Sequence, residues 1–361
     1  MEGRYRRLCY SGHGVRRANG VRRARRFSPV HLAVPALVLL SLLTPAPQGQ
    51  LSDDDFTSAE KNYQEGRLAE AEALYARIGP GHPDYPQAQL HLGAIFYSTG
   101  RPVLAERCFR ENLRFRESAE VYSLLAGAQF NQEKLDEALE SAKKALTLDP
   151  KNAKAHTALG MVYTAHKDWL HADAAYGEAL RLDPKDSSPW FLQGRSYFLR
   201  NEFEKAKDAF ETALRLYPQS VRTYENLALT LDLLGQPAAA EKMFLRGVET
   251  NRRGARSEAR IHIAYAAFLF KLDRLEESET QLQEAVKAEP QNPEARYELA
   301  RVLSRRKQWK EAASQAEAAL RAGKPDYRVH FLLSRIYTVL GDQPAALFHA
   351  QRAALLADQP R

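Results

Sequence analysis

The sequence predicts an all-α fold in which helical hairpins stack one after another along almost the whole chain. Two observations support it: apolar residues recur at steps of three or four, as on one helix face, and the whole pattern returns after 34 residues. One hairpin cannot bury its own apolar face, so neighbours must stack. The first set is Leu159, Gly160, Tyr163, Ala172, Tyr176, Ala179 and Pro184, and the second is Trp190, Gly194, Tyr197, Ala206, Phe210, Ala213 and Pro218.

The segment 153–186 shows why this spacing encodes a helix pair. Gly160 and Ala172 are small where two antiparallel helices must approach, and the large ring of Tyr176 fills the space beside them. Asp168 falls in the short connection, where polar helix-breaking residues are expected. Pro184 has no amide hydrogen and cannot continue the second helix, so the helix ends there.

This spacing of an aromatic residue, Leu-Gly, Tyr, Ala, a second aromatic, Ala and Pro resembles the tetratricopeptide repeat. The resemblance implies a right-handed superhelical solenoid of about nine repeats, with a concave groove that binds protein segments. The predicted repeats cover 52–85, 86–118, 119–152, 153–186, 187–220, 221–254, 259–292, 293–326 and 327–360. Residues 251–256 are expected to lengthen the connection before the seventh repeat. The solenoid then occupies 51–361 and leaves no separate catalytic domain.

Residues 1–50 are predicted to be a leader. They carry nine Arg residues between positions 4 and 26, an apolar run over 32–43, and a segment of small residues over 44–50. These three parts are typical of a secretory signal peptide, and the run is shorter than the ~20 residues that span a bilayer. We expect export to the periplasm. An uncleaved membrane anchor and an Arg-rich organellar transit segment are the alternatives.

The charge balance favours a protein partner over nucleic acid. The formal net charge is +7, but the leader supplies nine Arg and one Glu, which leaves 43 basic and 44 acidic residues from Leu51 onward. A nucleic-acid-binding helical repeat would need a strongly basic surface, so it remains an alternative only. Cys9 and Cys108 are the two cysteines, and we expect Cys108 to be a buried free thiol.

The sequence contains no motif for catalysis and implies no cofactor. A phosphate-binding glycine loop, a nucleophile elbow and an HExxH zinc motif are all missing. His166 and His171 are the best metal candidates, but their five-residue step spans a turn and favours solvated side chains. His262 and His330 take the large-residue position of a first helix, where packing is expected. We therefore predict a non-enzyme without a metal site; an accessory subunit of an enzyme is a further alternative.

The resemblance places certain positions of each first helix on the concave surface. An aromatic residue followed by Arg four positions later lies on one helix face, and this pair occurs in three of the last five repeats. Apolar anchors and forked guanidinium donors would suit an acidic segment, although packing between repeats or pairing with Glu294 or Glu298 would equally explain them. The candidate groove residues are Phe191, Arg195, Phe198, Arg222, Arg260, Tyr297, Arg301, Arg328, Phe331 and Arg335.

The last predicted helix, 345–357, carries Leu347, Ala350, Ala354 and Leu355 without a polar capping helix after it. Terminal repeats normally need a polar outer face. We therefore expect this end to contact another copy of the chain, a partner or a membrane surface. The sequence thus predicts an exported scaffold that assembles other proteins, with an organellar or membrane-anchored assembly factor as an alternative.

Overall fold

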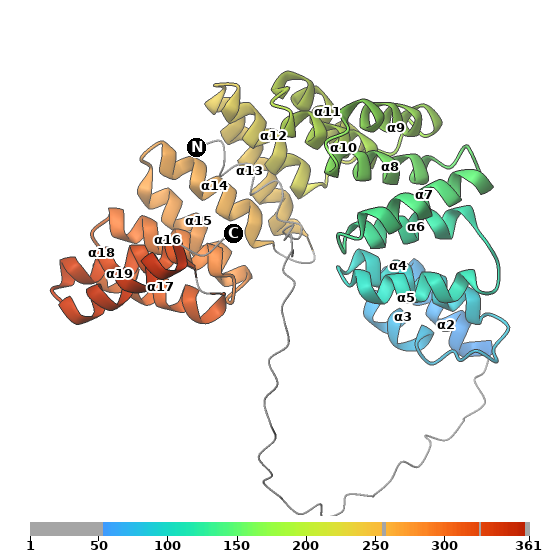
Figure 1. The fold of residues 1–361 in the computed structure, drawn as a ribbon, viewed down its shortest axis with the longest axis horizontal. Coiled ribbons are helices and arrows are strands. Elements are labelled where there is room, and N and C mark those ends of the chain that lie inside the picture. Colours follow the sequence, from blue (N-terminus) through green and yellow to red (C-terminus); the bar gives the residue numbers. More distant parts are fainter. Residues whose placement is uncertain (1–52, 255–257, 325, 358–361) are drawn as a thin grey trace, which may run out of the picture. The chain divides into compact units, whose positions relative to one another are not determined.

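The computed structural model of the chain describes residues 53–254, 258–324 and 326–357 (Figure 1). In these ranges all regular secondary structure is helical, and consecutive helices pack as pairs, from α2 with α3 to α18 with α19. The predicted all-α fold of stacked helical hairpins is confirmed. The superhelical hand and the number of repeats stay predictions. The predicted leader lies outside the described residues.

The chain divides into two compact units, with the boundary between Pro184 and Lys185. The helices of the first unit are α2 (Asp53–Gln64), α3 (Leu68–Tyr75), α4 (Tyr85–Ser98), α5 (Pro102–Leu113), α6 (Ala119–Phe130), α7 (Leu135–Leu148), α8 (Ala153–Ala165) and α9 (Trp169–Leu182). Those of the second unit are α10 (Ser187–Leu199), α11 (Phe203–Leu216), α12 (Val221–Leu233), α13 (Pro237–Arg253), α14 (Ala259–Lys271), α15 (Leu275–Ala288), α16 (Pro293–Arg305), α17 (Trp309–Ala322), α18 (Tyr327–Leu340) and α19 (Gln343–Ala357). Among the described residues, none of the helices has the length and apolar character needed to cross a membrane.

The helix ends follow from local side chains. Asn152 and Asn292 precede α8 and α16, and their side-chain oxygens accept hydrogen bonds from the amides of Ala155 at 2.9 Å and Ala295 at 3.0 Å. These bonds satisfy amides that the first turn of a helix leaves without a partner. The turn inside each described pair holds one residue with a positive φ, at intervals close to 34 residues. These residues are Gly66, Gly100, Glu133, Lys167, Asn201, Gly235, Asp273, Lys307 and Gly341.

The predicted close approach of paired helices occurs at Gly160. A Cβ atom on this residue of α8 would lie 2.5 Å from Cε1 of Tyr176 on α9, and the Tyr176 side chain is 1 % exposed. The same contact recurs at Gly194, where a Cβ would lie 2.7 Å from Cε1 of Phe210. The helices can therefore pack at this distance only because glycine has no side chain.

The expected longer connection at 251–256 is wrong for its first three residues, because α13 continues to Arg253. Arg252 and Arg253 pair with Glu249 at 2.9 Å and 2.8 Å, and charge pairs three and four residues apart stabilise a helix. The Asn251 side chain then binds the backbone of Glu258 through both its donor and its acceptor, at 3.0 Å and 2.8 Å. These bonds close the loop that leads into α14.

Candidate partner-binding surface

The first helices of the hairpins form a continuous series within the second unit. α10 packs on α12, α12 on α14, α14 on α16 and α16 on α18, while each second helix packs mainly on the first helices before and after it. The exposed side of α10, α12, α14, α16 and α18 is called the first-helix face below. Every predicted groove residue belongs to one of these five helices.

The first-helix face contains three carboxylates that lie beneath the cations that neutralise them. Glu225 receives a hydrogen bond from Arg260 at 2.9 Å, and Asp232 pairs with Lys271 at 2.7 Å. Glu298 pairs with Arg301 at 2.5 Å. The exposed fractions of the side chains are 1 %, 3 % and 9 % for the acids, against 23 %, 38 % and 22 % for their cations. Solvent therefore meets the cations and not the acids.

Burial shifts the pKa of one of these acids. Desolvation raises the pKa of the Glu225 carboxyl, and the guanidinium of Arg260 opposes that shift. A carboxylate at such depth depends on its partner for its charge, because an unpaired buried charge is strongly unfavourable. The Glu225–Arg260 pair also connects α12 with α14, so it orders the surface as well as setting its charge.

The Tyr297 ring lies between two of the predicted groove arginines. The Arg328 guanidinium carbon is 4.9 Å from the ring centroid, and that of Arg301 is 5.8 Å away. Arg328 also pairs with Asp326 at 2.7 Å and with Glu294 at 3.0 Å, and these two carboxylates raise its pKa although burial acts in the opposite direction. Both arginines thus have structural partners within the unit, as the packing alternative for these residues proposed.

The three predicted residues of α10 have different environments. Phe191 is half-buried, with its ring centroid 5.9 Å from that of Phe210, and the Arg195 guanidinium lies 5.9 Å from the Phe191 ring. Phe198 belongs to the hydrophobic core, is 2 % exposed and contacts Phe203 at a centroid distance of 5.5 Å. Its place as a groove residue is therefore wrong, because the ring turns inward from the first-helix face and offers almost no surface to a partner.

Arg222, Phe331 and Arg335 remain open to solvent. Arg222 lies at the start of α12, and Phe331 and Arg335 lie one turn apart on α18. The Phe331 side chain is 58 % exposed. Lys271 also belongs to this face, but the aromatic–Arg spacing does not include it, and its partner Asp232 is 39 residues away in the sequence.

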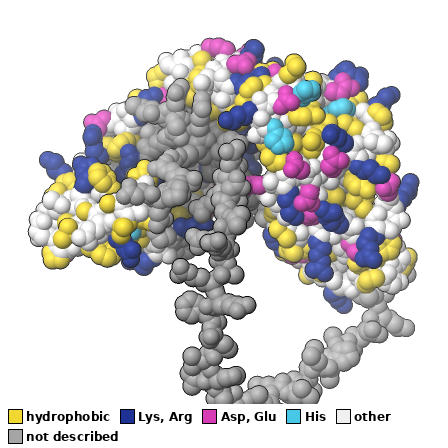
Figure 2. Space-filling view, viewed as in Figure 1, with side chains coloured by type: hydrophobic (Ala, Val, Ile, Leu, Met, Phe, Trp, Pro, Cys, Tyr) yellow, Lys and Arg dark blue, Asp and Glu magenta, His cyan; other side chains and the backbone are white. Residues whose placement is uncertain are grey.

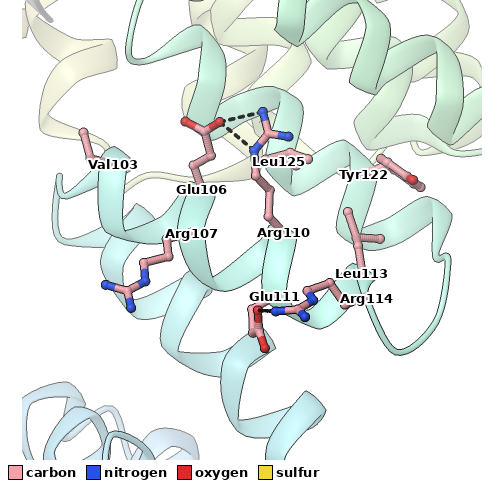
Figure 3. Close-up of a pocket in the computed structure, with 9 residues that line it drawn as sticks. All are labelled: Val103, Glu106, Arg107, Arg110, Glu111, Leu113, Arg114, Tyr122 and Leu125. Atoms are coloured by element: carbon pink, nitrogen blue, oxygen red, sulfur yellow. Dashed lines mark hydrogen bonds and ion pairs between the residues drawn. The ribbon is translucent and has the colours of Figure 1, made fainter. Parts of the chain in front are cut away.

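The first unit has a cleft of about 600 Å³ between α5 and α6 (Figure 3). Arg107, Arg110 and Arg114 line it from one side of α5, together with apolar side chains. Arg110 pairs with Glu106 at 2.9 Å and Arg114 with Glu111 at 2.9 Å, while Arg107 is directed away from both of these pairs. Carboxylates inside the cleft thus offset most of its positive charge. Over the first unit, basic and acidic side chains alternate on the face in Figure 2.

The histidines and the cysteine considered for metal binding or reactivity have structural roles in the described residues. His171 Nδ1 lies 2.7 Å from the Asp168 carboxylate at the exposed start of α9, and among the described residues no three His, Cys, Asp or Glu side chains form a metal-binding group. His262 and His330 are buried, as their packing positions predict. Cys108 is also buried, which raises the pKa of its thiol to about 11.

Comparison with known families matches two parts of the chain. The family described as the cilia and flagella-associated protein 70 C-terminal domain matches residues 55–264, which is more than half of the chain. The tetratricopeptide repeat matches residues 269–336. None of the curated proteins compared with the chain matches it.

Several solved structures share the fold at low sequence identity. The crystal structure of yeast Tom70 is 16 % identical with a TM-score of 0.59, over 88 % of this chain and 66 % of that one. The APC/C hetero-tetramer Cut9-Hcn1 gives 16 % identity and a TM-score of 0.58, over 85 % of this chain and 61 % of that one. A tetratricopeptide repeat protein from Parabacteroides merdae gives 15 % and 0.52, over 71 % of this chain and 100 % of that one. The chain thus spans about three fifths of the Cut9-Hcn1 chain, and these likenesses concern the fold alone.

Proposed function

The chain belongs to the tetratricopeptide-repeat family described as the cilia and flagella-associated protein 70 C-terminal domain, and on that premise we propose that it is a non-enzymatic scaffold. The proposed ligand is an acidic, extended segment of a partner protein. The proposed site is the first-helix face of the second unit. This fold is consistent with a protein–protein interaction scaffold, and the acidic character of the segment is inferred from the charges of this face.

The observation that carries the proposal is that acidic side chains on the first-helix face are buried while their basic partners are exposed. Glu225 and Asp232 are sealed below the surface, and their cations Arg260 and Lys271 are the groups that face solvent. The side chains of Arg260 and Lys271 are 23 % and 38 % exposed, so a carboxylate of a partner can approach both cations. The exposed Arg222 and Arg335 add two further cations at positions where the resemblance expects partner contact.

Phe331 supplies the apolar part of the proposed site. Its exposed ring lies one turn from Arg335 on α18, so one partner segment can bury an apolar side chain and place a carboxylate beside it. Such an arrangement of a central aromatic anchor and a forked cation is common where proteins bind each other. The site would therefore select acidic segments that also carry an apolar residue.

The test uses the protein without its leader and a fluorescent peptide that alternates Glu with Leu. We expect the wild-type protein to bind this peptide. The double variant Arg222→Glu/Arg335→Glu should bind it about tenfold or more weakly, because two interfacial charges are reversed. Arg301 is unsuitable for this test, because its loss would leave Glu298 without its cation. The control is Arg181→Glu, which reverses an exposed charge on α9. Equal binding by the double variant and the wild type would refute the proposed site.

A nucleic-acid ligand is tested in the same assay with a single-stranded oligonucleotide of similar length. Binding of the oligonucleotide in place of the peptide, with a steep loss on addition of salt, would contradict the proposed ligand class. Turnover by the purified chain alone would contradict the non-enzymatic role.

We also propose that the protein is exported, on the sequence of residues 1–50 alone. The basic, apolar and small-residue segments support a cleaved signal peptide and a periplasmic location. Mass spectrometry of the mature protein tests this, and an N-terminus between Pro47 and Leu51 is the expected result. An intact leader would instead support the membrane-anchored or organellar alternative.

A further inference from the structure

The outer side of the hairpin α18–α19 exposes apolar side chains where the preceding hairpin exposes polar ones. Positions 34 residues apart are equivalent in these two hairpins, because α16 and α18 begin at 293 and 327 and α17 and α19 begin at 309 and 343. The exposed Arg305, Ser314 and Arg321 correspond to Val339, Phe348 and Leu355, which are 56 %, 52 % and 61 % exposed. Packing within the array does not require these three apolar residues.

The same hairpin does not have a charge pair that joins three of the other hairpins to the hairpin after them. The fifth residue of the second helix is Glu72 in α3, Glu106 in α5 and Glu241 in α13. Each accepts a bond at 2.7 Å from the basic residue that precedes the next second helix, namely Arg101, Lys134 and Arg274. In α19 this fifth residue is Leu347, which is 61 % exposed. The fifth residue is also apolar in α7 and α17, as Leu139 and Ala313, and each of those two helices packs on the first helix that follows it.

The shape of α19 also fits a helix. Ala313 and Ala316 of α17 are buried under the packed α18, and their equivalents Leu347 and Ala350 are exposed. Ala350 and Ala354 lie one turn apart and are both exposed, so a second helix would meet only their short side chains there. Close packing of two helices depends on such a match of small and large side chains.

The charge on this face is positive. Arg352 is the one Lys, Arg, Asp or Glu residue of α19, and the carboxylate of Asp342, directly before the helix, accepts a hydrogen bond from the Ala345 amide. The Arg352 guanidinium lies 5.9 Å from the exposed Phe348 ring. A second copy bound through the same face would bring like charges together, whereas acids on a partner would pair with them.

We propose that this face of α18–α19, formed by Val339, Leu347, Phe348, Ala350, Ala354 and Leu355, binds an amphipathic helix of a partner protein whose apolar stripe is flanked by acidic residues. The site is separate from the first-helix face, since α19 provides most of it. The partner helix would occupy the place on α19 that α18 occupies on α17. Arg352 would bind an acid at the edge of the stripe.

The test uses the full chain and two designed peptides of about 18 residues, long enough to form a helix on binding. Both carry the same leucine stripe at helical spacing, and one has Glu and the other Lys on the flanks. By fluorescence anisotropy we expect the Glu peptide to bind about tenfold more tightly than the Lys peptide, which is typical of a few interfacial charge pairs. We expect Leu347→Asp/Leu355→Asp to weaken the Glu peptide by at least about tenfold and Arg352→Gln by about threefold.

Two controls make the result decisive. Leu170→Asp changes a side chain of α9 that is 78 % exposed, and it should not affect binding of the Glu peptide. Because Leu347 and Leu355 are largely exposed, circular dichroism should show unchanged helix content for their variant. Equal affinity for both peptides, or equal loss with Leu170→Asp, would overturn the proposal. So would a dimer or binding to phosphatidylglycerol vesicles that Leu347→Asp/Leu355→Asp abolishes while the two peptides fail to compete.

Discussion

Adding a single methyl group at Gly160 tests the reasoning that links the repeat pattern to helix packing. In Gly160→Ala the new Cβ would stand 2.5 Å from Cε1 of Tyr176, well inside contact distance, and the buried Tyr176 ring has no free space to move into. Overpacking of this kind costs about 1–3 kcal/mol. The higher helix propensity of alanine returns about 1 kcal/mol, so we expect a net destabilisation of up to about 2 kcal/mol.

The partner helix contains a matched control. Gly177 lies in α9, near Tyr176 in sequence, and a Cβ there would meet nothing within 4 Å. Gly177→Ala therefore gains the helix propensity without the clash, and we expect it to stabilise the hairpin by about 0.5–1 kcal/mol. Both substitutions add one methyl group to a helical glycine, but Gly160→Ala should lower the stability of the hairpin and Gly177→Ala should raise it.

Hydrogen exchange of the α8 and α9 amides, followed by mass spectrometry, measures these local free energies of opening. Local measurement is preferable, because arrays of repeats need not unfold in a single step. Faster exchange in Gly160→Ala and slower exchange in Gly177→Ala is the expected result. If both variants slowed exchange, the close approach of α8 and α9 would be refuted, because propensity alone would then decide stability.

Three further predictions concern single contacts. Gly235→Ala, at a residue with φ 72°, should lower the free energy of unfolding by about 1 kcal/mol, measured by urea titration, because a side chain strains this backbone conformation. Arg301→Ala should cost about 1–3 kcal/mol in the same titration because Glu298 loses its cation, and Glu298→Gln in the same chain should recover part of it. Burial lowers the pKa of His330 and of His349, whose Nδ1 atoms are 2.9 Å apart, so the folded state binds fewer protons than the unfolded one below about pH 6.5. The free energy of opening of the α18–α19 amides, taken from exchange rates corrected for the pH dependence of intrinsic exchange, should then fall as the pH falls through this range, and His349→Gln should reduce that dependence. An unchanged opening free energy between pH 7.5 and 5.5 would contradict it.

The periodicity of the sequence was enough to predict the helix pairs and their closest contact. Gly160 and Tyr176 were placed together from spacing, because the three- and four-residue steps fix a helix face and the repeat fixes its partner. The extension of α13 was not predicted, because the four-residue slip of the repeat frame shows that residues are inserted before the seventh repeat but not whether they continue a helix. The pairs of Glu249 with Arg252 and Arg253 make that segment helical.

The candidate site was less predictable, because the spacing of residues along a helix does not show how deeply each side chain is buried. The aromatic–Arg pattern located Tyr297 and Arg301 on one face but did not show that Glu298 lies below Arg301. Phe198 lies on a first helix, as predicted, but its ring is part of a core formed by several helices and does not reach the first-helix face. Contacts such as Asp232 with Lys271 join positions 39 residues apart, which only the packing of one first helix on the next brings together.

Net charge therefore gives little guidance to the partner of such an array. Acidic and basic residues are almost equal in number after Leu51, yet the two signs do not reach solvent equally on the first-helix face. The side chains of Glu225 and Asp232 are 1 % and 3 % exposed, while those of Arg260 and Lys271 are 23 % and 38 % exposed. An approaching carboxylate interacts most strongly with the nearer cation, because water and ions screen charges that lie farther away. A nearly neutral array can thus present a cationic face to an acidic segment.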